Sequence, residues 1–281
     1  MAISLLNNIA ALAAQNQLQG TQNKLQSTLF QLSSGSRINT GADDAAGLAI
    51  ANGLQANVTA LTQSANNAQN GVGALQVSDG ALAQVTTLLN RAVTLATESA
   101  NGTVGNSQRN ALDAEFTQIK AEIDRIGSST TFNGTSVFTA TATGIFLSDG
   151  SSAAANNTIS VTVGTLSSSA ISYNGSTVSF ASDNLLTSGA AITSLADINS
   201  AISNVAGLRG TIGAGVNRLQ SAVNVISSQV QNLTAAQDQI TAANIPQQVT
   251  NLSEFSILNQ SGISALAQAN SAQQSILKLL Q

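Results

Sequence analysis

Two adjacent aspartates, Asp43 and Asp44, are the residues of this sequence whose type and spacing most directly suggest chemistry. Paired carboxylates can bind a metal ion or exchange protons with a substrate. No other ligand type lies nearby, and Thr40 stands three residues before Asp43, as in a helix-capping box. The positive end of the helix that follows would also favour Asp44. Because capping explains both carboxylates, we expect no metal site and no cofactor here.

The composition also argues against catalysis. The chain has 281 residues, with no His and no Cys, so it lacks the commonest general base, the commonest zinc ligand and any thiol nucleophile. A metalloprotease motif of the HExxH type cannot occur without His. The net charge is -4, and the nine Lys and Arg residues are spread thinly, unlike the basic stripe that binds nucleic acid. We expect neither an enzyme nor a nucleic-acid-binding protein.

Charged residues make up 8% of the chain, against about 25% in an ordinary soluble domain. Asn, Gln, Ser and Thr take the place of Lys and Glu on the helix faces. Such faces carry neutral hydrogen-bonding groups and do not repel one another, so they can pack against copies of themselves.

The first residues do not resemble a secretory signal. The first cation is Lys24, and Asn7 and Asn8 interrupt the apolar run, whereas a signal peptide has a basic start and an unbroken apolar core. No stretch approaches 18 uninterrupted apolar residues, so we expect no membrane insertion. If the protein leaves the cell, we expect a route without a cleaved signal peptide.

Two long apolar seams indicate long helices. Between residues 54 and 100, we count fourteen positions that are spaced alternately four and three residues apart, and twelve of them are apolar. The same count between residues 195 and 240 also gives twelve of fourteen. The charged positions are Asp79 in the first seam and Arg209 in the second. Seams of nearly equal length predict two antiparallel helices lying side by side. The alternative is a compact bundle of separate short helices, in which such long registers are uncommon.

A third helix is expected between the seams. The same steps place apolar residues from Leu112 to Ile126, and Gly127 follows where a helix C-terminal cap belongs.

The segment from 130 to 190 has the character of short strands. Asn133-Gly134 and Asn174-Gly175 are tight-turn signals, and residues 158 to 163 alternate with period two. Because an insertion at the end of a helical rod disturbs packing least, we expect this β segment at the distal tip.

The two chain ends carry apolar stripes wider than the seam of a two-stranded coil. A lone helix hairpin cannot bury so wide a face, so we expect partners from other molecules. The alternative is that both ends fold back on the central bundle, although breaks near Gly35 and Pro246 separate them from it. The residues that we assign to assembly are Leu25, Leu29, Leu32, Ile263, Leu266, Ile276, Leu277 and Leu280. The expected fold class is mainly α: a long antiparallel coiled-coil helical bundle, a rod, with terminal helices and a small β insert at the distal tip.

The block LSSGSRINTGADDAAGLAIA spans 32 to 51, and EIDRI, TTFNG, ALAQAN and ILKLLQ follow it along the chain. These motifs resemble those of bacterial flagellins, the subunits of the flagellar filament, and they occur in the family's order. The resemblance covers about 1 to 138 and 195 to 281. It departs from the family pattern at 239 to 246, which loses most of the usual charge, and at Gln281, where the family usually ends in Arg.

The resemblance implies a division of the chain. The expected segments are an N-terminal assembly helix of the inner tube (1–34), an N-terminal spoke (35–44), the first part of the helical bundle with a β-turn (45–138), a small β-rich outer insert (139–190), the second part of the bundle (191–240), a linker (241–248) and a C-terminal assembly helix (249–281). The spoke residues expected to serve assembly are Arg37, Asn39, Asp43 and Asp44.

The resemblance also implies a function. A flagellin is exported unfolded by the flagellar type III apparatus and polymerises outside the cell into a filament used for swimming. Its partners are copies of itself, an export chaperone, and the hook-junction and cap proteins. The alternatives are a hook-filament junction protein, which resembles flagellin at both ends, and a secreted amphipathic coiled coil that binds lipid or a host receptor as a monomer.

One further candidate partner is Toll-like receptor 5. Flagellins that this receptor detects present an Arg and, four residues on, a Leu along the long helix of the bundle, with a Glu on the next helix. Arg91, Leu95 and Glu115 match these positions, while Asn90 stands where many detected flagellins have Gln. The alternative is that these residues serve subunit packing.

Overall fold

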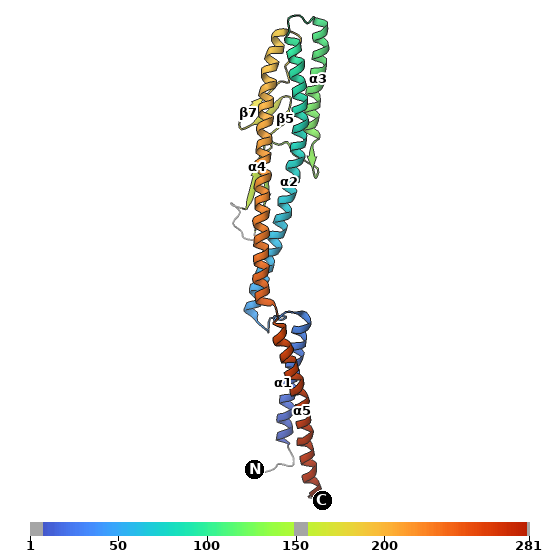
Figure 1. Ribbon diagram of the computed structural model, residues 1–281, viewed down its shortest axis with the longest axis vertical. Coiled ribbons are helices and arrows are strands. Elements are labelled where there is room, and N and C mark those ends of the chain that lie inside the picture. Colours follow the sequence, from blue (N-terminus) through green and yellow to red (C-terminus); the bar gives the residue numbers. More distant parts are fainter. Residues whose placement is uncertain (1–7, 149–156, 280–281) are drawn as a thin grey trace. The chain divides into compact units, whose positions relative to one another are not determined.

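The computed structural model describes residues 8–148 and 157–279, excluding the side chains of 276–279 (Figure 1). Leu280 and the side chains of Ile276 and Leu277 therefore lie outside the described residues. The contacts divide the chain into two units, one of residues 1–56 with 233–281 and the other of residues 57–232. Within the described part, long helices predominate and the strands are short, so the predicted mainly α fold with a small β segment is confirmed.

Three helices build the unit of residues 57–232: α2 (Ala45–Ala100), α3 (Asn106–Ser129) and α4 (Ser188–Thr241), of which α2 and α4 continue beyond it. The Ser188 hydroxyl donates to the Ala100 carbonyl at 2.6 Å, and farther along Gly215 packs beside Leu75. Residue numbers rise along α2 as they fall along α4, so the predicted antiparallel pair is confirmed.

The charged positions of the two seams meet each other. Arg209 Nε lies 2.7 Å from Asp79 Oδ1, and the second guanidinium nitrogen lies 3.3 Å from Asp79 Oδ2. The sequence interpretation did not foresee this pair. A charged pair inside an apolar seam favours one register, because a slip of one heptad would place each charge opposite an apolar residue.

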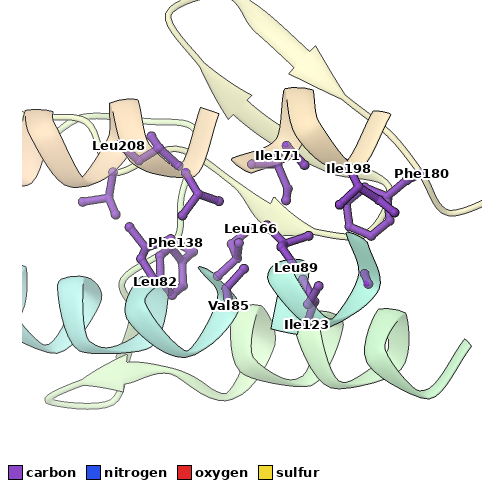
Figure 2. Packing of buried hydrophobic residues seen from close by; sticks show 14 of the residues in the cluster. Leu82, Val85, Leu89, Ile123, Phe138, Leu166, Ile171, Phe180, Ile198 and Leu208 are labelled. Carbon is purple, nitrogen blue, oxygen red and sulfur yellow. The ribbon is translucent and has the colours of Figure 1, made fainter. Parts of the chain in front are cut away.

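The core of this unit gathers side chains from the helices and from the β segment. Figure 2 shows Leu82 and Leu89 of α2 and Ile123 of α3 packed together with Leu166 and Ile171 of the strands. Each fully buried Leu, Ile or Phe stabilises the fold by about 1.5–3 kcal/mol relative to its exposed state.

Seven short strands form three small antiparallel sheets among the described residues. The Asn133-Gly134 and Asn174-Gly175 turns have positive φ at both residues, as predicted for tight hairpins. The strands are β1 (Thr131–Phe132), β2 (Thr135–Ser136), β3 (Thr143–Phe146), β4 (Thr158–Val161), β5 (Leu166–Ser167), β6 (Ala170–Tyr173) and β7 (Ser176–Val178).

The small β insert of the expected fold is present, and its strands lie along the helices rather than beyond their ends. Ile145 packs against Gly71 of α2, and Val161 packs against Gly215 of α4, so the strands lie along the helices and share their core. The reason is steric, because a helical glycine leaves room for a side chain to approach the backbone.

Gly127 has the same role, and the expectation that it caps α3 is wrong. The helix continues through Gly127 to Ser129, and its C-cap is Thr130. A Cβ at Gly127 would collide with the carbonyl oxygen of Leu166 in β5. The glycine is therefore required by the close approach of a strand.

The helices of the other unit are α1 (Ile9–Ser34) and α5 (Ile245–Leu279). As expected, α1 ends at Gly35, which adopts the left-handed conformation with φ of 69°. The expected linker up to residue 248 is too long, because α5 begins at Ile245 and Pro246 lies in its first turn. Proline is tolerated there, since the N–H that it lacks would have no helical partner. No helix among the described residues has the length and apolar character needed to span a membrane.

The close approach at Gly127 can be tested by substitution. Gly127→Ala should lower the free energy of unfolding by about 1–3 kcal/mol, because the added methyl group overpacks against a backbone atom. Gly80→Ala on α2 is the matched control, since nothing lies within 4 Å of its added Cβ. That variant should be unchanged or more stable by up to ~1 kcal/mol. Urea denaturation of the monomer measures both, and a Gly127→Ala variant as stable as the wild type would contradict the packing described.

Candidate functional site

Helices α1 and α5 lie side by side (Figure 1). The Asn8 amide donates to the Ala269 carbonyl at 3.2 Å near one end, and the Lys24 ammonium lies 5.9 Å from the centre of the Phe255 ring. The two helices are therefore antiparallel. The predicted assembly residues that are half-buried are Leu25, Leu32 and Leu266.

The centre of this pairing holds little apolar surface. The buried residues of α1 are Thr21 and Thr28, whose hydroxyls donate to the carbonyls of Gln17 and Lys24 in the same helix. Among the described side chains of α1 and α5, no Leu, Ile, Val or Phe is buried. The pair is consequently held by a thin, partly polar contact.

Large apolar side chains remain exposed on the outer faces of both helices. Phe30 of α1 is 59% exposed and Ile257 of α5 is 68% exposed. Leu12 and Phe30 are eighteen residues apart, about five turns at 3.6 residues per turn, so they lie on the same side of α1. The others are Ile9 and Leu29 on α1 and Ile245, Val249, Leu258 and Ile263 on α5. We call these exposed apolar residues the apolar assembly surface.

A short backbone ladder joins the two chain segments that follow α1 and α4. The Ala243 amide donates to the Gly35 carbonyl at 2.9 Å, and the Arg37 amide donates to the Thr241 carbonyl at 2.7 Å. The Arg37 guanidinium also donates to the Ile240 carbonyl at 2.9 Å. The acceptors are backbone carbonyls, so the loss of side-chain charge at 239–246 does not remove this polar contact.

Asp43 holds the turn that precedes α2. Its Oδ2 accepts hydrogen bonds from the amides of Thr40 at 2.8 Å and Asn39 at 3.0 Å, and from the Thr40 hydroxyl at 3.1 Å. These bonds, the Thr40 amide first, lower the pKa of the Asp43 carboxyl. The resulting stabilisation is complete above the ordinary pKa of Asp and is lost as the pH falls through the lowered value.

Asp44 caps α2. Its Oδ1 accepts a hydrogen bond from the Gly47 amide at 2.8 Å, and its backbone carbonyl accepts from the Leu48 amide at 2.9 Å. This is N-cap geometry. The capping roles expected of Thr40 and Asp43 belong to the preceding turn instead, because the helix itself begins at Ala45.

The three residues matched to receptor recognition are only partly brought together. Arg91 and Glu115 form a two-pronged ion pair, with Nε to Oε1 at 2.7 Å and the second pair of atoms at 3.0 Å. The hydrogen bonds from Arg91 lower the pKa of the Glu115 carboxyl. Leu95 has an exposed fraction of 0% and belongs to the core. The pair therefore offers a polar surface, and Leu95 is not part of it.

Two family models match the chain. The bacterial flagellin N-terminal helical region matches residues 5–143, and the bacterial flagellin C-terminal helical region matches residues 195–280. Flagellin FlaB1 of Treponema pallidum is 34% identical over 283 residues, and a flagellin of Halalkalibacterium halodurans is 31% identical over 274 residues. Each alignment covers 98% of both chains. A crystal structure of Bacillus cereus flagellin matches with a TM-score of 0.48 and 30% identity, over 61% of this chain and 94% of that one.

The cap at Asp44 predicts a local effect of substitution. Asp44→Ala should destabilise the first turn of α2 by about 1 kcal/mol, because the Gly47 amide loses its acceptor. Hydrogen exchange at the Gly47 amide measures this directly. Asp44→Ser is the control, since serine also caps helices and should protect the amide better than alanine does. Unchanged exchange at Gly47 in Asp44→Ala would show that the carboxylate is not the cap.

Proposed function

This chain belongs to the bacterial flagellins, a family of structural proteins and not of enzymes, and we propose that it polymerises with copies of itself into the flagellar filament used for swimming. The observation that carries the proposal is the apolar assembly surface of α1 and α5. Burying one such side chain against a neighbour contributes about 1.5–3 kcal/mol. Within the described part of the chain, these side chains find no such burial.

The contact between copies is heterologous in this proposal. Each copy uses one surface to receive a neighbour and a different surface to join the next, and a contact that does not close on itself generates a helical polymer. The low charge of the chain supports this, because neutral Asn, Gln, Ser and Thr on the helix faces allow copies to approach without repulsion.

Export belongs to the same proposal. The subunit leaves the cell unfolded through the flagellar type III apparatus and folds as it joins the growing end, with an export chaperone, hook-junction proteins and a cap as partners. The absence of Cys is compatible with passage as an extended chain, since no disulfide has to form or break. The thin pairing of α1 with α5 supports completion of these helices at the point of assembly.

Seeded growth tests the proposal. Ile257→Asp should slow elongation from wild-type filament fragments about tenfold or more, because it removes at least ~1.4 kcal/mol of contact per subunit. Gln260→Glu adds the same charge at a neighbouring polar position of α5 and should elongate like the wild type. Sedimentation of polymer measures growth, and circular dichroism checks that both monomers keep their helix content.

Two results would contradict the proposal. One is a wild-type subunit that never extends a seed and stays monomeric at high concentration. The other is an Ile257→Asp variant that elongates as fast as the wild type, since the apolar assembly surface would then play no part.

Recognition by Toll-like receptor 5 stays a proposal that rests on the resemblance. The geometry supports the exposed Arg91–Glu115 pair as the contact. Arg91→Ala monomer should therefore give a weaker signal in a receptor reporter assay than wild-type monomer. Arg125→Ala is the control, because it removes an exposed arginine paired with Glu122 within α3. Equal signals from the two variants, or no signal from the wild type, would refute the proposed contact.

A further inference from the structure

Residues 180–187 connect the last strand to α4, and side chains of α3 hold them in place. Lys120 Nζ donates a hydrogen bond to the Asp183 carbonyl at 2.6 Å. Asp113 Oδ1 accepts one from the Leu185 amide at 2.7 Å. Lys120 and Asp113 are seven residues apart, about two helical turns, so they lie on the same face of α3. This face of α3 therefore fixes the backbone of the connecting segment.

Helix α4 contacts the same segment and brings a carboxyl group to it. The Ser194 hydroxyl donates to the Asn184 carbonyl at 3.1 Å. Asp197 lies three residues farther along α4 and therefore on the same face as Ser194. Its carboxyl group meets that of Asp183, the residue before Asn184. We call Asp183 and Asp197 the carboxyl pair.

One oxygen atom of the carboxyl pair is left without a partner. Asp183 Oδ2 is buried and has no hydrogen bond to any residue that the structure describes. Buried polar atoms in proteins are nearly always hydrogen-bonded, because an unpaired one loses its bonds to water without a replacement. An ionised carboxylate accepts hydrogen bonds and donates none. If both members of the pair were ionised, two like charges would face each other at a buried contact.

A single proton would remove this conflict. A protonated carboxyl group carries an O–H donor, so either member of the pair could then donate a hydrogen bond to the other. The proton would also remove one of the two negative charges. Burial, and then the charge of Asp197, raise the pKa of the Asp183 carboxyl above its ordinary value.

The other charged groups near the pair do not take the place of the proton. Lys120 of α3 opposes the rise in the pKa of Asp183 without cancelling it, and its ammonium group donates to two backbone carbonyls. Asp113 of α3 accepts from the Leu185 amide. Helix α2 contributes the uncharged Ser99, whose hydroxyl donates to the Leu185 carbonyl.

We propose that Asp183 and Asp197 form a proton-binding site, in which the two carboxyl groups share one proton and thereby hold residues 180–187 against α4. When the proton leaves, the two carboxylates repel each other and the segment loosens. The site belongs to the folded single subunit and does not depend on the proposed polymerisation.

The direction of the pH response follows from the raised pKa of Asp183. The folded state binds the proton more tightly than the unfolded chain does. The stabilisation is therefore complete below the ordinary pKa of Asp and is lost as the pH rises through the raised value. The turn at Asp43 responds in the opposite direction, because the pKa of its carboxyl is lowered.

Asparagine substitution tests the shared proton. The amide of Asp183→Asn supplies a permanent N–H donor to the Asp197 carboxylate and removes one charge. At neutral pH, the folding equilibrium constant of the full-length monomer should rise about tenfold, the effect of one hydrogen bond to a charged group. Below the ordinary pKa of Asp, this advantage should disappear. Asp197→Asn should behave in the same way, because either residue can supply the donor. Urea denaturation over a series of pH values measures both variants.

Hydrogen exchange at the Leu185 amide reports on the segment itself. In the wild type, protection of this amide should fall as the pH rises from mild acid to neutral, whereas in Asp183→Asn it should stay constant. Glu98→Gln is the matched control, since it removes one negative charge at an exposed position of α2. Its protection should follow the wild-type curve. Constant protection in the wild type, or a Glu98→Gln variant that behaves like Asp183→Asn, would overturn the proposal.

Two further measurements separate a proton from a cation and remain valid if a variant is less stable. Infrared spectra of the wild-type monomer should show a protonated carboxylic acid above the ordinary pKa of Asp, and its absence would refute the shared proton. Magnesium or calcium chloride, added at neutral pH and constant ionic strength, should leave the protection of Leu185 unchanged. A rise that Asp183→Asn abolishes would assign the site to a divalent cation and overturn the proposal.

Discussion

The uneven burial of large apolar side chains is the constraint on which the rest of the structure depends. In residues 57–232, Leu, Ile and Phe from helices and strands fill one core. In the pair of α1 and α5, the buried positions of α1 are Thr21 and Thr28, and apolar residues such as Phe30 and Ile257 stay exposed. By this measure, the unit of residues 57–232 buries its large apolar side chains within its own core. The pair of α1 and α5 has apolar surface in excess of what its own contacts cover, which is what a polymer-forming subunit requires.

Glycine is the second feature that organises the fold, because it has no side chain to keep a neighbouring group away from the helix. Gly71, Gly127 and Gly215 admit Ile145, the Leu166 carbonyl and Val161 to the helix surface, which is how thin strands lie along long helices. A helical glycine is costly unless something approaches it closely. The same reasoning separates the glycines that the subunit uses from those, such as Gly210, that it leaves open. Glycine lowers the stability of the helix at Gly71, Gly127 and Gly215, and the close contacts made there compensate for that loss.

Much of the fold followed from the amino-acid pattern, for a physical reason. A seam repeating every three or four residues over forty positions has few alternatives to a long helix, and an Asn-Gly pair with positive φ has few alternatives to a tight turn. Long-range packing was harder to predict. The glycine at position 127 has the local signature of a cap and is explained only by a strand forty residues away. Leu95 is similar, because a match to a motif does not reveal whether a side chain points outward. At the candidate site, Leu29 and Ile263, which the sequence pattern assigned to assembly, are exposed. The Asp79–Arg209 pair of the long helices was not foreseen, since it needs the antiparallel register.

The ladder between Gly35 and Ala243 has a consequence for how this region can vary. Its donors contact carbonyl groups that every amino acid possesses, so residues 240–243 can be exchanged without loss of the bonds, provided the backbone course is kept. The two partners are therefore under unequal demands. Ser36 and Arg37 contribute side-chain donors, so these two side chains must be retained. Residues 240–243 contribute backbone groups, so their side chains can differ between related chains without loss of the hydrogen bonds that join the two segments.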